Sequence, residues 1–228
     1  MPELYRKGAP LAEGAENRVY REYFNPNRVI KERSPEARET PRRTIARYHL
    51  GKVAHLLFPE QIPDVYGAGT KPRTQVHVAY TPLDKYHKAA NKMIIGEAAD
   101  AVEFKKLDNL AREGERAMEE DPLFGNFLKE MKEAGLEADD SPINYTKFRG
   151  VISYVDSFTP WRGEGNWSMG FANTGAPERG YDAARLQQAI QRIHDPVVQE
   201  KALFHFYRLE SLFLKECQEF EAKHQQKT

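Results

Sequence analysis

The turn-forming segment at residues 136–144 constrains this chain more than any other stretch. It reads Leu-Glu-Ala-Asp-Asp-Ser-Pro-Ile-Asn, so Asp139 and Asn144 stand five positions apart around a proline. An apolar run at 151–155 comes next and ends at Asp156. A loop and a strand end of this kind can aim three oxygen-bearing side chains at one point, and Mg²⁺ bound to a triphosphate needs such ligands. The alternative is an ordinary turn, because Asp and Asn are common turn residues.

The composition limits the class of protein. The chain has 228 residues, of which 40% are hydrophobic and 30% are charged, and its formal net charge is zero. These values predict a soluble globular protein with one large domain or two small lobes. No apolar run approaches the ~18 residues of a membrane span, the N-terminus lacks the apolar core of a signal peptide, and the lone Cys217 excludes an internal disulfide. We therefore expect a cytoplasmic protein with no membrane partner, and zero net charge disfavours a general nucleic-acid binder.

Residues 5–33 are predicted to form three short strands. The turn at 11–20 contains Gly14, and the second turn contains Asn-Pro-Asn at 25–27, a strong breaker combination. The third strand places Lys31 directly after two β-branched residues. A glycine-bearing hairpin tip can bring backbone N–H groups close to phosphate oxygens, and a neighbouring lysine would neutralise phosphate charge. The alternative is a solvated hairpin with a surface lysine.

The next segment predicts one helix and two further strands. Ser34-Pro35 and Thr40-Pro41 each combine an N-cap with a proline at the first helical position. Apolar residues then recur at helical spacing until Phe58-Pro59 ends the pattern. Strands are expected at 62–67 and 74–80, which gives five strands and a helix. Eight Lys or Arg residues lie between positions 28 and 52, and they indicate either a patch for RNA or a solvated helix face.

The remainder of the chain is predicted to be mainly helical. Residues 85–120 favour helix, Pro122 opens a shorter helix that Gly135 ends, and two helices are expected at 181–193 and 196–222. The segment at 161–180 is rich in Gly, Asn, Ser and Pro and is predicted to be a loop. The last helix carries an apolar stripe that we expect to be core: Val198, Ala202, Phe206, Leu209, Phe213 and Phe220.

Taken in order, these motifs resemble those of protein kinases. Segment 11–20 is similar to the kinase Gly-rich loop, with Gly14 and Val19 in register, and Val29-Ile30-Lys31 resembles the strand that carries the kinase lysine. The spacing from Asp139 to Asn144 is that of the catalytic loop. More narrowly, residues 14–16, 19–20 and 31–33, with Arg43-Thr44 beyond them, resemble the small atypical kinase of the KEOPS tRNA-modification complex. RIO kinases and aminoglycoside phosphotransferases are similar in plan, and the resemblance covers about 8–80 and 136–158.

The resemblance implies a bilobal α+β fold. Residues 1–82 would form an N-lobe with a five-stranded antiparallel sheet and a helix, and residues 83–228 a reduced, mainly helical C-lobe. It implies ATP and Mg²⁺ as cofactors and transfer of the γ-phosphate to a hydroxyl of a protein or small-molecule acceptor. The implied roles are catalytic for Asp139 and Lys31, nucleotide-binding for Gly14, Ala15, Val19, Lys31 and Tyr80, and metal-binding for Asn144 and Asp156.

Two departures from the kinase pattern support an alternative. Where the regulatory helix normally supplies a Glu to pair with the lysine, residues 46–51 read Ala-Arg-Tyr-His-Leu-Gly, and Glu36 or Glu39 are the nearest substitutes. Glu137 and Ala138 stand where the H-R-D motif has His and Arg. The alternative is therefore a catalytically weak pseudokinase or nucleotide-binding scaffold, with an RNA-associated module as a third hypothesis.

Overall fold

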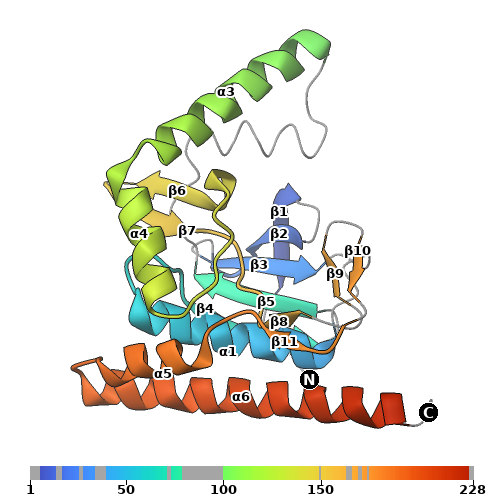
Figure 1. Ribbon diagram of the computed structural model, residues 1–228. Coiled ribbons are helices and arrows are strands. Elements are labelled where there is room, and N and C mark those ends of the chain that lie inside the picture. The colour runs from blue at the N-terminus through green and yellow to red at the C-terminus, as the bar shows by residue number, and fades with distance from the viewer. Residues whose placement is uncertain are drawn as a thin grey trace.

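The computed structural model describes residues 6–13, 17–25, 28–33, 40–70, 73–78, 100–148, 150–162, 166–168, 171–173 and 175–225. Over these ranges the chain is an α+β protein (Figure 1). A five-stranded antiparallel sheet forms from the first third of the sequence, and helices dominate the later part of the chain.

The sheet has the strand order β1-β2-β3-β5-β4. Its strands are β1 (Lys7–Glu13), β2 (Asn17–Glu22), β3 (Arg28–Arg33), β4 (Val65–Thr70) and β5 (Arg73–Val78). The central strand β3 pairs with β2 on one side and β5 on the other, and it buries Val29 and Ile30. The five predicted strands are confirmed, although β4 starts at Val65 rather than at Ile62, which lies in a buried bend.

Helix α1 (Pro41–Leu57) lies between the sheet and the last helix, α6 (Pro196–Gln225) (Figure 1). As predicted, Thr40 caps it by accepting a hydrogen bond from the backbone N–H of Arg43. The helix approaches β4 closely at Gly51, where a Cβ atom would lie 2.9 Å from a methyl carbon of Val65. Because α1 has a neighbour on two sides, polar residues of this helix are buried along with the apolar ones.

The other helices are α3 (Ala101–Glu119), α4 (Pro122–Glu133) and α5 (Ala183–Gln191). Asp side chains cap the N-termini of α3, α4 and α5, and the Asp195 carboxylate accepts from the backbone N–H of Val197 at the start of α6. The predicted helices after residue 121 are confirmed, whereas only the second part of the 85–120 prediction lies within the described residues. Gly135 ends α4 with φ +82°, and a Cβ there would lie 2.6 Å from the carbonyl oxygen of Asp182.

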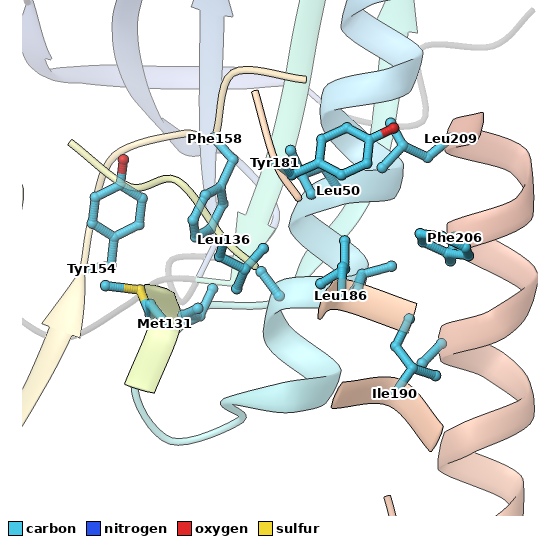
Figure 2. Close-up of a cluster of buried hydrophobic side chains, with 14 of the residues drawn as sticks. Leu50, Met131, Leu136, Tyr154, Phe158, Tyr181, Leu186, Ile190, Phe206 and Leu209 are labelled. Carbon is cyan, nitrogen blue, oxygen red and sulfur yellow. The ribbon is translucent and has the colours of Figure 1, made fainter. Parts of the chain in front are cut away.

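One buried cluster joins α1, α4, α5 and α6 (Figure 2). The predicted stripe on α6 belongs to it: Ala202, Phe206, Leu209 and Phe213 are buried, and Val198 and Phe220 are partly buried. The cluster also contains residues from both sides of the predicted lobe boundary at 82/83. That boundary stays a prediction, because residues 79–99 lie outside the described ranges.

The predicted loop at 161–180 is wrong in part. Within it, β8 (Trp161–Arg162) pairs with β11 (Glu178–Arg179), and β9 (Asn166–Ser168) pairs with β10 (Phe171–Asn173). The strands are only two or three residues long, so the turn residues around them dominate the composition. Trp161 is fully buried and packs against Phe213 with ring centroids 6.0 Å apart, which ties this segment to the core.

The sequence analysis also missed one strand of a hairpin. β6 (Tyr145–Phe148) pairs with β7 (Val151–Tyr154), and only the second of these strands was predicted. Gly150 has φ +83° in the turn between them.

Within the described ranges, no helix is both long enough and apolar enough to cross a membrane.

The basic residues of the 28–52 segment are largely engaged within the protein. Arg42 forms ion pairs with Glu216, at 2.9 Å, and with Glu219 on α6. Lys52 pairs with Asp64 at 2.6 Å, and the side chains of Arg43 and Arg47 are buried. The solvated-face interpretation is therefore wrong for much of α1.

A histidine pair lies at the α1–α6 interface. The Nδ1 atoms of His49 and His205 are 2.8 Å apart, so one ring must donate an N–H and the other must accept it. Burial, together with the charges of His205 and Arg208, lowers the pKa of His49 to about 4. Burial and Lys52 lower the pKa of His205 to about 4, with Asp64 opposing them. Protonation of the pair would place two N–H donors against each other.

We predict that the protein loses stability as the pH falls from about 6.5 to about 4. In this window the unfolded chain binds protons on both histidines, whose ordinary pKa is 6.5, while the folded chain does not. The melting temperature of the wild type should therefore fall more steeply with decreasing pH than that of a His49→Gln/His205→Gln variant. Equal pH dependence in the two proteins would contradict the neutral pair.

Candidate functional site

Lys31 on β3 contacts the segment that follows β7, although the two are far apart in sequence. Its Nζ donates a hydrogen bond to the carbonyl oxygen of Val155 at 2.6 Å and lies 3.5 Å from the hydroxyl of Ser157. Asp156, the residue between these two partners, is the predicted metal ligand. The structure thus brings the predicted lysine and the predicted metal-binding turn together.

The charge on Lys31 depends on Asp156. Burial lowers the pKa of the Lys31 amine, the Asp156 carboxylate opposes this by raising it, and Arg47 and Arg33 lower it again. An ammonium group that is removed from water is stabilised by a nearby negative charge. Asp156 acts in this direction on the partly buried Lys31.

The β6–β7 hairpin explains why Asn144 lies next to the Asp156 turn. Asn144 ends a short 3₁₀ helix, η2 (Pro142–Asn144), directly before β6 begins, and Val155 follows β7 directly. Because the ends of a hairpin meet, the backbone N–H of Val155 donates to the carbonyl oxygen of Asn144 at 2.8 Å. The two predicted metal ligands therefore come from adjacent stretches of backbone.

Asp139 lies in the loop between α4 and η2. Its carboxylate accepts from the backbone N–H of Ser141 at 2.9 Å, and the side chain is exposed. Its carbonyl oxygen accepts a hydrogen bond from the Tyr145 hydroxyl at 2.9 Å. Burial, followed by the charges of Asp139, Asp140 and Asp156, raises the pKa of Tyr145. Three carboxylates therefore act on the pKa of this tyrosine.

Arg47 takes the position on α1 where the kinase resemblance implies a Glu. Its guanidinium donates to the carbonyl oxygen of Phe158 at 2.8 Å and lies 3.4 Å from that of Ser157. The helix therefore contacts the Asp156 turn through a buried cation, which also lowers the pKa of Lys31. The predicted substitutes Glu36 and Glu39 lie outside the described residues. Sequence reasoning missed Arg47, although its place one turn before the buried Leu50 and Gly51 indicated an inward-facing cation.

The remaining predicted residues divide into two groups. Val19 on β2 is partly buried and pairs in register with Lys31. Gly14, Ala15 and Tyr80 lie outside the described residues, so their nucleotide-binding roles stay predictions.

Glu137, which stands in place of a residue of the H-R-D motif, is exposed, and its carboxylate oxygen lies 3.5 Å from the Arg162 guanidinium.

The donor set suits a metal ion that arrives with a nucleotide. Among the described residues, no group of three or more His, Cys, Asp or Glu side chains is arranged to hold a metal ion. Asn144 and Asp156 provide one amide and one carboxylate. Mg²⁺ in phosphotransfer sites commonly uses one or two protein oxygens and takes the others from phosphates and water. The residues present therefore fit Mg²⁺ held jointly by protein and nucleotide.

No protein-family model matches this chain, and no curated protein is similar to it in sequence. The kinase resemblance therefore stays a prediction from the order of the sequence motifs.

We predict that Arg47→Ala destabilises the protein by about 2–4 kcal/mol, because it removes charge-assisted hydrogen bonds and leaves buried carbonyl groups without a donor. Arg42→Ala, on the same helix, should cost much less, since its ion pairs are partly solvated. Urea unfolding of the two variants measures the difference. Equal losses would show that Arg47 does not anchor the Asp156 turn.

Proposed function

We propose that this protein is an ATP- and Mg²⁺-dependent phosphotransferase of the protein-kinase-like type. It would transfer the γ-phosphate to a hydroxyl of a protein or small-molecule acceptor. The observation that carries the proposal is the contact of Lys31 with the backbone of Val155 and the charge of Asp156. This contact joins the two halves of the predicted site across more than a hundred residues of sequence.

The arrangement of the elements supports the same proposal. A five-stranded antiparallel sheet with one helix packed on it agrees with the expected N-lobe, and the helix-rich remainder agrees with a reduced C-lobe. The β6–β7 hairpin brings the backbone of Asn144 next to that of Val155, the residue before Asp156, which supports a metal site shared by Asn144 and Asp156.

Each residue then has a defined task. Lys31 would exchange its bond to Val155 for the nucleotide phosphates and stabilise their charge. Asn144 and Asp156 would hold Mg²⁺, which neutralises phosphate charge when bound. The exposed Asp139 carboxylate would accept the proton of the acceptor hydroxyl or orient that hydroxyl. Gly14, Ala15, Val19 and Tyr80 would contact the nucleotide.

A second candidate is a nucleotide-binding scaffold with little turnover. Arg47 favours it, because α1 offers a cation where an active kinase pairs its lysine with a carboxylate. The replacement of the H-R-D residues by Glu137 and Ala138 points the same way. An RNA-associated module has less support, since Arg42, Arg43, Arg47 and Lys52 are buried or paired within the chain.

We predict that ATP raises the melting temperature, and that Mg²⁺ increases the shift. Asp156→Ala should abolish the Mg²⁺-dependent part and most ATP turnover, because it removes a metal ligand. Asp139→Asn should keep the thermal shift and lose turnover by about 10²–10⁴-fold. Asp140→Asn is the matched control, as it removes the neighbouring exposed carboxylate and should leave turnover near the wild-type value.

The outcomes separate the candidates. The phosphotransferase proposal would be contradicted if Mg²⁺ did not increase the thermal shift with ATP and if no ATP turnover depended on Asp156. A thermal shift with ATP but no turnover in the wild type would favour the scaffold. Salt-sensitive RNA binding without any nucleotide effect would favour the third candidate.

A further inference from the structure

The side-chain hydroxyls of two tyrosines in the β6–β7 hairpin interact with the backbone of Asp139. Tyr145 is the first residue of β6 and Tyr154 the last of β7, and they are directly paired across the hairpin. Both side chains are almost completely buried, with ring centroids 5.1 Å apart. Directly paired residues lie on the same face of a hairpin, so the two hydroxyls reach the same neighbouring loop.

The two hydroxyls satisfy both polar groups of one peptide residue. The Tyr145 hydroxyl donates to the carbonyl oxygen of Asp139 at 2.9 Å. The backbone N–H of Asp139 donates to the Tyr154 hydroxyl oxygen. The main chain of Asp139 is thereby fixed while its carboxylate stays exposed.

The tyrosines are themselves fixed by aromatic packing. Tyr145 contacts Phe124 and Phe127 of α4, with ring centroids 4.8 Å and 6.3 Å away. Tyr154 packs against Phe158 at 4.9 Å, beside Leu136 and Met131 (Figure 2). The pair therefore has little freedom to shift, and it connects the Asp139 loop to β7, the strand that precedes the Asp156 turn.

We propose that Tyr145 and Tyr154 are positioning residues for phosphoryl transfer, which set the Asp139 carboxylate relative to Asp156. This inference rests on the proposed function. The hairpin would position the Asp139 carboxylate. The two residues before Asp139 cannot do so in this chain, because Ala138 has no polar side chain and Glu137 is exposed toward Arg162. A displacement of about 1 Å in a reacting group can cost about 10²-fold in rate.

The test compares Tyr145→Phe and Tyr154→Phe with Tyr181→Phe, using ATP turnover to ADP with Mg²⁺. Each change removes only a hydroxyl and keeps the ring. Tyr181 is a matched control, because it is equally buried but its hydroxyl donates to Glu210, at 2.5 Å. We expect kcat to fall about 10- to 100-fold in the first two variants, with KM for ATP unchanged within about two-fold, and Tyr181→Phe to keep the wild-type kcat.

A double variant separates positioning from general destabilisation. If Tyr145 acts through Asp139, then Tyr145→Phe has no further effect on kcat in the Asp139→Asn background. An active wild type with an unchanged kcat in Tyr145→Phe and Tyr154→Phe, or with additive losses in the double variant, would overturn the positioning role alone. A wild type without ATP turnover would instead overturn the proposed phosphotransferase function, and the positioning role with it.

Discussion

The hydrogen bond from Lys31 to the carbonyl of Val155, with Asp156 as countercharge, is the interaction on which the rest of the site depends. It joins the central part of the sheet to the end of the β6–β7 hairpin. A lysine amine loses much of its hydration when it is buried, so the position is stable only where an acceptor and a carboxylate are both in reach. A nucleotide phosphate that replaced the carbonyl would add negative charge beside Asp156, and a bound Mg²⁺ would be needed to offset that charge. In the proposed function, the bond from Lys31 to Val155 marks where the phosphates would bind.

Helix α1 gives this arrangement its rigidity. It lies against the sheet on one side and α6 on the other, so its polar residues must find partners inside the protein. Arg47 reaches the carbonyl groups next to Asp156, Arg42 reaches acidic residues of α6, and His49 pairs with His205. A shift of α1 would disturb all three contacts together. The position of α6 is thus coupled, through α1, to the turn that carries the predicted metal ligand.

The sequence predicted the elements with strong local signals. Val29 and Ile30 after a strong turn indicated β3, and a proline at the first helical position marked α1, α4 and α6. The structure describes five of the residues predicted for the site, whose roles stay predictions: Val19, Lys31, Asp139, Asn144 and Asp156. The sequence analysis missed β6 and the two- and three-residue strands, because such short segments carry no periodicity. It missed Arg47, Tyr145 and Tyr154 as well, since their roles come from side-chain contacts with loop backbone that hydrophobic periodicity does not predict. Gly14, Ala15 and Tyr80 stay predictions.

The central claim is that Lys31 and Asp156 belong to one nucleotide site. A double-mutant cycle on these two residues, with the dissociation constant of Mg²⁺·ATP as the readout, tests it most directly. The variants Lys31→Met and Asp156→Asn should each weaken binding, and the double variant should lose much less than the sum of the two single losses. Strictly additive losses, or affinity unchanged in either single variant, would contradict a shared site.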